Sequence, residues 1–544
     1  MKQCNINIYL KIKKCIAFLA ILLCANSLFS QEIIPLSRDL YLRIDKSLYS
    51  KGTDFHSAVK PYLRSEADKH TNTDSLLMIN RKRNLKEISW FHRKLRYQSF
   101  ISVDTTDFKL RVDPLFNLEM SKQKDYNKSL YNNTRGVYLQ GQIGKYVAFN
   151  SCFYENQSVF NEYVDEFAKK YKVVPGQGYP KNFGTGGYDY SSSMGVLSVN
   201  LAKYFNIQFG HGENFIGDGY RSLLLSDNSF SYPFLKITTN IWKFQYTNLY
   251  TSFQDLNAPH SYESGFQKKY GTFHHLSYNV TKWLNIGLFE GIVWQAKDST
   301  GNRGFDINYL NPIIYYRPVE YSLSSPDNAL IGLNTKITFA KKSYLYGQFV
   351  LDDLDIGGSK KGDGYILNKY GYQAGIVNFD LFGLNGLTFQ VEYNQVQPYV
   401  YAHKTPLQNY SHYNQALAHP LGANFKEGIL LIDYKIKDFT FGFQYNYAIY
   451  GADTNGTHWG NDIFQSDFDA QRGFPSYGNK ILQGLKTTIN YWDAHISYLI
   501  NPRTNMNLVL GIARRTMTSD LNDKSANLVY FGFRTSLTNL YYDF

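Results

Sequence analysis

The chain has 544 residues, of which 17% are aromatic (47 Tyr, 38 Phe and 6 Trp), yet its mean hydropathy is −0.37. Such an aromatic content excludes a disordered protein. The polar average argues against a bundle of membrane helices, which needs long apolar runs. The abundance of tyrosine favours β-structure, where aromatic side chains pack on half-buried pleated surfaces. The length allows either several soluble domains or one large barrel.

The first 30 residues predict an export leader. Four lysines precede an apolar stretch, Ile16–Ala25, that is too short to cross a bilayer. We therefore expect a signal peptide over residues 1–30, cleavage before Gln31 and Sec-dependent export. Three of the four cysteines lie in this leader, so Cys152 alone remains and no disulfide framework is expected. Removing the four leader lysines lowers the net charge from +12 to +8. In an exported protein this excess favours anionic lipid or acidic polysaccharide as partners, and not nucleic acid.

Residues 31–130 differ in pattern from the rest and predict a small helical segment on the periplasmic side. Helices are expected over Thr53–Leu63 and Arg81–Tyr97. In the second, Leu85, Ile88, Phe91 and Leu95 recur at helical spacing among many basic residues. Such a helix either binds a membrane surface or polysaccharide, or packs under the following domain with its charged face in water. We prefer the second interpretation.

From residue 131 to the C-terminus the dominant pattern has period 2, as in Ile331–Phe339, Leu387–Asn394, Phe439–Tyr447 and Met506–Ile512. Each strand therefore has one apolar and one polar face. Gln, Glu, Asn and Lys on the polar face suit a water-filled lumen, and the apolar face suits lipid. In lipid only helices and closed barrels satisfy every backbone group. The sequence therefore predicts an all-β fold, a transmembrane outer-membrane β-barrel.

The connections support the same fold. Short turns, such as those near Gly144-Lys145, Lys341-Lys342 and Lys437-Asp438, alternate with long polar segments expected to be extracellular loops. We expect 18 antiparallel strands over residues 131–544, in a monomer. Leu540, Tyr542 and Phe544 alternate at the C-terminus. They predict a final strand with a terminal aromatic signal for the barrel assembly machinery.

The densest group of glycines and polar residues lies between Phe209 and Asp227. Gly212 and Gly217 have the spacing of the phosphate-binding loop, but Asp218 stands in place of its essential lysine, and the G-x-G-x-x-G spacing is not met. His211 and Glu213 lack a third ligand at a fixed offset, so neither a metal nor another cofactor is expected. We favour tight turns at the glycines and an Arg–carboxylate network in the lumen that pins an inward loop. The candidate residues of this motif loop are His211, Glu213, Asn214, Asp218, Arg221 and Asp227.

A second candidate site is the loop segment Gly451–Asn479. Exposed aromatic rings beside carboxylates can stack on sugar faces and bind hydroxyls. The alternative is a loop folded over its own small cluster. The candidate sugar-binding residues are Asp453, Trp459, Asp462, Phe464 and Tyr477. If they bind sugar, deleting residues 455–475 abolishes polysaccharide retention. Segments 352–358 and 453–459 resemble fragments of calcium loops, without the full spacing or closing Glu.

The stretch His211–Asp227, followed by Tyr232-Pro-Phe, resembles the signature of the RemB proteins of gliding bacteria. These are similar to the wider family of Wzi-type capsule assembly proteins. The stretches Arg135–Gln157 and Asn311–Glu320, the latter with Arg317 and Glu320 as further candidate lumen residues, agree with it. The resemblance covers roughly residues 35–544. It implies an 18-stranded outer-membrane barrel with a helical periplasmic-side segment, a lectin-like role toward exopolysaccharide in the Wzi branch, and participation in surface motility for RemB. It supplies no catalytic residues.

Three functions remain open. The first is a non-enzymatic cell-surface barrel that binds or assembles polysaccharide, with a lumen closed by inward loops. The alternative is a diffusion channel or solute transporter with an open lumen. The third, a barrel enzyme, lacks both the G-x-S-x-G and the H-E-x-x-H motif, so we expect no enzyme. The first hypothesis is preferred.

Overall fold

The alternation seen in the sequence gives each long strand an outward and an inward face. In β25 (Met506–Ser519), Leu508, Leu510 and Ile512 are exposed, whereas Val509 and Gly511 between them are buried. The computed structural model describes residues 32–77, 88–259, 265–298, 301–312, 327–353, 364–454, 456–468 and 476–544. The predicted leader, residues 81–87 of the predicted helix Arg81–Tyr97, and Arg317 and Glu320 lie outside the described residues. Of the rest of that predicted helix, Trp90–Arg96 is helical.

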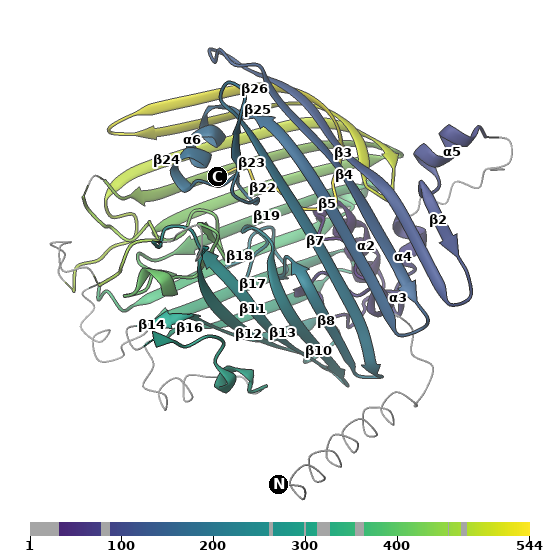
Figure 1. The fold of residues 1–544 in the computed structure, drawn as a ribbon, viewed down its shortest axis with the longest axis horizontal. Helices are drawn as coiled ribbons and strands as arrows, with labels where there is room; N and C mark the ends of the chain where they lie inside the picture. Colours follow the sequence, from purple (N-terminus) through teal and green to yellow (C-terminus); the bar gives the residue numbers. More distant parts are fainter. Residues whose placement is uncertain are drawn as a thin grey trace, which may run out of the picture.

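Eighteen antiparallel strands close into a barrel (Figure 1), which confirms the predicted fold class and strand number. Closure is made by β26 pairing with β3, from Leu528 opposite Gln123 to Arg534 opposite Asn117. The strands are β3 (Phe108–Gln123), β4 (Leu130–Ile143), β5 (Val147–Val159), β7 (Gly187–Ala202), β8 (Phe205–Gly212), β10 (Tyr232–Ile241), β11 (Phe244–Asp255), β12 (Gln267–Asn279), β13 (Leu284–Gln295), β16 (Asn328–Phe339), β17 (Ser343–Asp353), β18 (Lys369–Phe379), β19 (Leu387–Val396), β22 (Phe425–Ile436), β23 (Phe439–Ala452), β24 (Leu485–Asn501), β25 and β26 (Asp523–Thr535).

The remaining described elements are short and lie at the barrel ends or inside it. The helices are α2 (Arg38–Ser50), α3 (Arg64–Asp68), α4 (Thr73–Leu77), α5 (Trp90–Arg96) and α6 (Glu162–Tyr171), with single 3-10 turns η2 (Ile307–Leu310), η3 (Leu381–Gly383) and η4 (Pro406–Gln408). The short strands are β1 (Val59–Lys60), β2 (Ile101–Asp104), β6 (Lys181–Phe183), β9 (Phe215–Ile216), β14 (Lys297–Asp298), β15 (Gly301–Asn302), β20 (Ser411–His412) and β21 (Gln415–Ala416). In the described part of the chain, no helix has the length and apolar character needed to cross a membrane.

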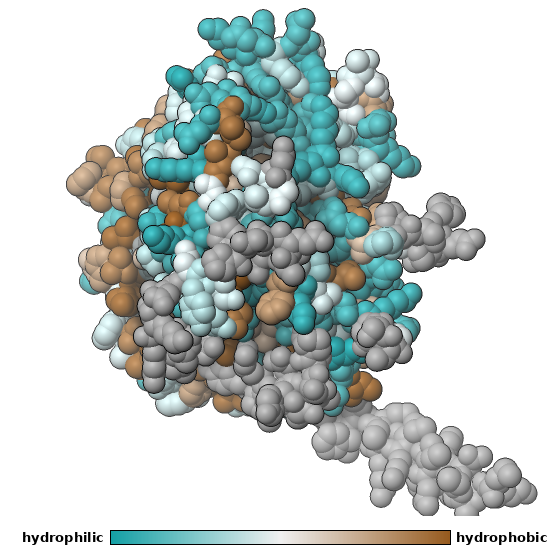
Figure 2. All heavy atoms as spheres, turned by 90° about the vertical axis from the view of Figure 1, so that its left-hand side faces the viewer, coloured by the Kyte–Doolittle hydropathy of each residue, from teal (hydrophilic) through white to brown (hydrophobic). Residues whose placement is uncertain are grey.

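The two ends of the barrel differ, as the sequence predicts. One end, here the turn end, carries tight connections such as 144–146, 340–342 and 437–438. The other, the loop end, carries the long connections. The polar segment 515–526 also has the pattern expected of a long extracellular loop, and this prediction is wrong. The segment is mostly strand, because β25 and β26 are joined by residues 520–522 alone. Figure 2 looks onto the left-hand side of Figure 1, where the loop end lies, and much of the surface there is hydrophilic, with hydrophobic residues gathered along one flank.

The barrel begins earlier than the predicted boundary at residue 131. Strand β3 is a full member of the wall, paired with β4 on one side and β26 on the other. Pro114 lies within β3, and the ladder continues past it. The separate N-terminal segment therefore ends shortly before residue 108.

The N-terminal segment enters the turn end of the lumen. The prediction of a helix over Thr53–Leu63 is wrong: Val59–Lys60 form β1, which pairs with β9 inside the barrel. Pro61 disfavours the helical conformation at the residue before it and supplies no N–H, while β9 offers a hydrogen-bonding edge. The long helix is instead α2, whose Leu40, Ile44 and Leu48 are buried.

The C-terminal tail, residues 536–544, also lies inside the barrel. The predicted final strand over Leu540–Phe544 is wrong, because β26 ends at Thr535 and the tail follows it without regular structure. Figure 1 shows the C-terminus beside α6 and not on the rim. The tail is held by partners of its own: Tyr163 donates to the carbonyl of Tyr542 (2.9 Å) and Arg515 to that of Phe544 (2.8 Å).

The interior is packed with protein, which differs from the water-filled lumen expected from the polar strand faces. Leu223, Leu224 and Leu225, from the loop after β8, are fully buried against inward-facing wall residues and residues of the loop 397–424. A second cluster joins α2 to Leu537 of the tail and to Leu115, Tyr138 and Cys152 of the barrel wall. The polar inward faces serve mainly to hydrogen-bond these inserted segments.

Candidate functional site

Arg221, the one arginine of the motif loop, is almost fully buried, with 1% of its side chain exposed. Its Nη2 atom lies 3.0 Å from Asp543 Oδ1 and 3.4 Å from Glu427 Oε1. The guanidinium also sits 4.9 and 5.0 Å from the ring centres of Tyr220 and Tyr541. Two carboxylates offset the cost of burying the charge, and the planar guanidinium stacks on the rings. Arg221 thus joins the motif loop to β22 and to the C-terminal tail.

The backbone of the same loop is held by Glu392 on the inward face of β19. Its two carboxylate oxygens accept the backbone N–H groups of Tyr220 (2.7 Å) and Arg221 (3.1 Å). Tyr346 donates to the same carboxylate at 2.7 Å. The close approach requires glycine at position 219, since a Cβ there would overlap Glu392 Oε2 and lie 2.7 Å from Tyr346 Cε2.

The structure does not bring Asp218, Arg221 and Asp227 into one direct network. Asp218 accepts from Ser57 of the N-terminal segment and from Asn334 (3.1 Å) on β16, with Lys336 Nζ at 3.8 Å. Asp227 accepts from Asn539 and Tyr541 of the tail, each at 2.9 Å. Each acid therefore fastens a different chain end inside the barrel, and Tyr541 links Asp227 to Arg221.

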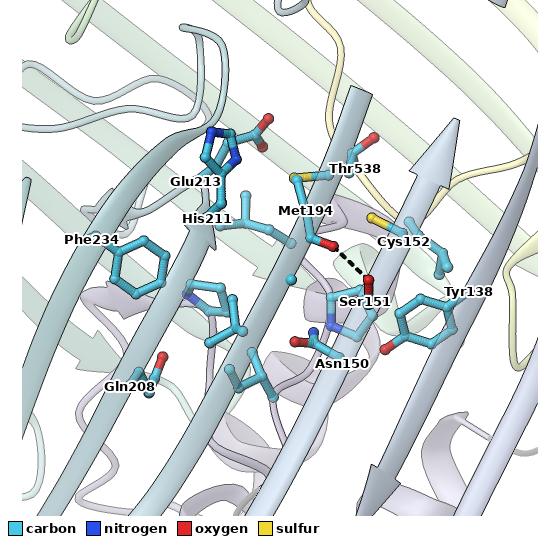
Figure 3. Close-up of a pocket in the computed structure, with 18 of the residues that line it drawn as sticks. Tyr138, Asn150, Ser151, Cys152, Met194, Gln208, His211, Glu213, Phe234 and Thr538 are labelled. Atoms are coloured by element: carbon cyan, nitrogen blue, oxygen red, sulfur yellow. Dashed lines mark hydrogen bonds between the residues drawn. The ribbon is translucent and has the colours of Figure 1, made fainter. Parts of the chain in front are cut away.

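His211, Glu213 and Asn214 lie at the start of the loop. Asn214 accepts a hydrogen bond from the buried Lys236 (3.0 Å). His211 and Glu213 line a small cavity of about 70 Å³ between the wall and the chain ends. Figure 3 shows these two side chains at one end of it, with Phe234 on one side and Cys152 and Tyr138 on the other. Glu213 makes no ion pair with another described residue. The described residues contain no cluster of three His, Cys, Asp or Glu placed to hold a metal ion.

Most residues of the second candidate site have structural partners. Asp453 accepts from the backbone N–H groups of Trp459 and Asp462 (2.8 Å for the latter) and pairs with His458 (3.4 Å). Burial acts to raise the pKa of Asp453, but these hydrogen bonds outweigh it and lower this pKa. Asp462 accepts from the backbone of Phe464 (3.0 Å), and Phe464 packs on the central apolar cluster. The contacts of Asp453, Trp459, Asp462 and Phe464 therefore hold the loop folded on itself.

Tyr477 differs from its four companions. It is exposed, and its ring lies 4.9 Å from that of Tyr365 in the neighbouring loop. Both line a groove of about 740 Å³ at the loop end of the barrel. The groove walls combine aromatic rings with amides and one ammonium group, from Tyr365, Asn368, Tyr370, Gln397, Tyr399, Tyr477, Asn479 and Lys480. The loops are tied together here, because Ile366 donates to Ser476 (2.9 Å) and Asn479 to Gly364 (3.0 Å).

Several of these residues carry little signal in the sequence. Glu392 belongs to a strand face predicted to be polar, and Glu427, Asp543 and Tyr541 lie outside the predicted candidate sites. A charged residue at an inward position of a predicted barrel strand was the available signal for the two glutamates. The groove residues Tyr365, Asn368 and Asn479 carried none, because the groove forms only where three loops meet.

The closed sheet of eighteen strands, its exposed apolar outer face and its plugged interior define an outer-membrane type β-barrel with a filled lumen. Among solved structures the chain is similar to Wzi of Escherichia coli, described as an outer membrane protein involved in group 1 capsule assembly and a carbohydrate-binding β-barrel. The two share 12% identity with a TM-score of 0.55, over 94% of this chain and 100% of that one. The chain is also similar to OprD of Pseudomonas aeruginosa, at 12% identity and a TM-score of 0.42, over 80% of this chain and 98% of that one. No family model and no curated protein matches the sequence.

Proposed function

We propose that this protein is a non-enzymatic outer-membrane barrel that binds surface polysaccharide at its loop end. The groove lined by Tyr365 and Tyr477 is the observation that carries the proposal. Its position at the loop end makes it accessible from the cell surface once the barrel spans the outer membrane. The fold similarity to Wzi, itself a carbohydrate-binding barrel, supports the same class of ligand.

The chemistry of the groove suits a saccharide. Aromatic faces offer apolar surface to the C–H side of a sugar ring, while amides donate to and accept from its hydroxyls. Tyr365 and Tyr477 provide the aromatic surface, and Asn368 and Asn479 the amides. Lys480 adds one cation, which favours a chain bearing carboxylate or other acidic groups.

The filled lumen weighs against the alternative of a diffusion channel or solute transporter. A channel needs a continuous water path, and the buried Leu223–Leu225 pack across the interior against the walls. The inserted segments are also fastened by charged contacts at Arg221, Asp218 and Asp227. Opening a path would require breaking several of these contacts together.

The wider role follows from the binding. A monomeric barrel that holds polysaccharide can retain capsule or slime at the cell surface or aid its assembly. The resemblance of residues 211–227 to RemB proteins extends this proposal to participation in gliding motility. Folding into the outer membrane by the barrel assembly machinery is part of the same proposal.

The test compares two exposed aromatic residues of one loop. Tyr477→Ala removes a groove wall, whereas Phe468→Ala removes a ring that is 62% exposed and lies outside the groove. We expect Tyr477→Ala, and more strongly its combination with Tyr365→Ala, to weaken binding of the purified surface polysaccharide at least tenfold. Phe468→Ala should bind within threefold of the wild type. Heat-modifiable migration on gels verifies that each barrel is folded.

Equal polysaccharide binding by the wild type and the double variant would show that this groove is not the binding site. If wild type binds no polysaccharide and instead conducts ions steadily in a planar bilayer, the channel alternative replaces it. The deletion of residues 455–475 is a poorer test than the sequence suggested. It removes Ile463, which is packed in the central cluster, and Asp467, which pairs with Lys369.

A further inference from the structure

The outer surface of the closing seam, formed by strands β24, β25, β26 and β3, contains a groove of about 800 Å³. Its floor is apolar. Leu510 and Ile512 on β25 and Val529 and Phe531 on β26 are exposed there, and Met120 on β3 is 74% exposed. Cross-strand pairing places Leu510 opposite Phe531, and Phe531 opposite Met120. These residues belong to the outward face that would meet acyl chains.

Three cations line the same groove nearer the loop end. They are Arg514 on β25, Lys122 on β3, and Lys124 just after β3. Lys122 and Lys124 are two residues apart, about 7 Å along the strand direction, and β25 lies two strands from β3, about 10 Å away. The three charges are therefore grouped over an area similar to that of a phosphorylated sugar headgroup.

The cations have no acidic neighbour in the sheet. Arg514 is paired with Trp492 on β24 and Asn527 on β26. Lys122 is paired with Val529, and the backbone N–H of Lys124 donates to Asn527 at 3.0 Å. Among the described residues none of the three side chains forms an ion pair. Elsewhere on the outer face Arg135 stands opposite Glu155, so an outward cation on this barrel can be matched by an acid.

A cluster of three cations without acidic partners favours the binding of an anion. Three like charges repel one another, and cations are costly on the lipid face except near the headgroups. An anion placed among them relieves both effects, and Arg and Lys are the residues that bind phosphate. The apolar floor directly below would receive an acyl chain attached to that anion. One molecule that combines both features is an acylated lipid with a phosphorylated headgroup.

We propose that the seam groove binds a phosphorylated, acylated glycolipid of the outer leaflet, with phosphate on Arg514, Lys122 and Lys124 and an acyl chain along Leu510, Ile512, Val529 and Phe531. The proposal rests on the proposed membrane location. The site covers the pair β26–β3, at which the barrel closes, and a bound lipid would hold these two strands together from outside.

The experiment uses the full mature chain in detergent and two triple variants. Arg514→Gln/Lys122→Gln/Lys124→Gln removes the cluster. Lys203→Gln/Lys282→Gln/Lys341→Gln removes the same charge from exposed residues in turn-end connections. Titration with diphosphorylated lipid A, followed by native mass spectrometry, should give wild-type binding at least tenfold tighter than that of the cluster variant. The control triple should bind as the wild type does. Enzymatically dephosphorylated lipid A should bind the wild type at least tenfold more weakly.

Equal binding by the cluster variant and the wild type overturns the proposal. So does equal wild-type affinity for the phosphorylated and dephosphorylated lipid, which would indicate a purely apolar contact. Failure here is distinguishable from failure of the proposed function. The cluster variant should still bind polysaccharide at the distant groove of Tyr365 and Tyr477, and heat-modifiable migration reports the barrel independently of either ligand.

Discussion

The guanidinium of Arg221 lies 3.0 Å from the carboxylate of Asp543, the penultimate residue of the chain. The pair joins a loop near the middle of the sequence to the C-terminal tail inside the barrel. Asp543 also accepts from Tyr220 (3.0 Å), Gln444 (2.5 Å) and Asn446 (2.9 Å). With three donors on Oδ2 and the guanidinium beside Oδ1, this carboxylate anchors the end of the tail inside the barrel.

We expect Asp543→Asn to release the tail without unfolding the barrel. Losing one partner of a buried ion pair costs about 3–5 kcal/mol, and Glu427 still faces Arg221, so roughly 1–3 kcal/mol should be lost locally. Hydrogen exchange of residues 536–544 should then accelerate tenfold or more. Asp520→Asn, in the exposed β25–β26 turn, serves as the control and should leave exchange of the tail unchanged. Tail exchange equal to that of wild type would show that Asp543 is not the anchor.

Gly219→Ala should loosen the motif loop from β19. The added Cβ overlaps Glu392, so the two backbone hydrogen bonds from Tyr220 and Arg221 cannot keep their geometry. Overpacking of this kind costs about 1–3 kcal/mol. We expect more frequent openings in planar-bilayer recordings than for the wild type, whose lumen is filled.

The matched control for this variant is Gly428→Ala, because a Cβ at that strand position meets no atom within 4 Å. It should record as the wild type does. If Gly219→Ala shows no more channel openings than the wild type, while hydrogen exchange shows that its motif loop is displaced, then the motif loop does not close the lumen.

The wall of the barrel follows from local pattern, and this is why the sequence predicts it. Leu508, Leu510 and Ile512 alternate with residues that face inward, and the alternation depends only on the period of a strand. The tight turns then mark where one strand ends and the next begins, so the number of strands can be predicted as well. The same reasoning fails at the C-terminus: Leu540, Tyr542 and Phe544 also alternate, but Asp543 finds its donors on Arg221 and β23, over distances in sequence that no local pattern encodes.

The contents of the lumen were only partly predictable. A Gly-rich stretch with Arg221 and Asp218 predicts an inward loop, because buried charges need partners. Their actual partners, Glu427 and Lys336, lie on strands whose polar faces serve equally well to line water or to bind protein. Trp459 and Tyr477 were equally hard to tell apart from the sequence, since both are aromatic loop residues. Only the folded structure shows that Trp459 is half-buried and Tyr477 is exposed.

Asp453→Asn tests whether the carboxylates of the Gly451–Asn479 loop bind sugar or hold the loop. We expect a structural effect, since Asp453 accepts two backbone N–H groups and pairs with His458. Loss of charge-assisted bonds should cost about 1–2 kcal/mol locally, which speeds exchange of residues 456–462 roughly fivefold or more. Polysaccharide affinity should change less than threefold. A tenfold loss of affinity without faster exchange would instead make Asp453 a ligand of the sugar.

Attachment of the N-terminal segment to the turn end should depend on pH through Asp380, which accepts from Lys46 of α2 (2.6 Å) and from Lys342 (2.7 Å). Burial acts to raise the pKa of Asp380, but the bonds from Lys342 and Lys46 outweigh it and lower this pKa to about 2, from an ordinary value of 3.8. A carboxyl with a depressed folded pKa stabilises the fold above its ordinary pKa, and the stabilisation is lost as pH falls from about 4 through 2.

A spin label at Ser50→Cys, at the exposed end of α2 in a Cys152→Ala background, should therefore become more mobile over that range and be unchanged between pH 5 and 8. Asp380→Asn should be mobile at every pH, while Asp104→Asn, whose carboxylate is exposed on β2, should behave as the wild type does. A wild-type label that stays immobile at pH 2 would show that Lys46 and Asp380 do not hold α2 in the lumen.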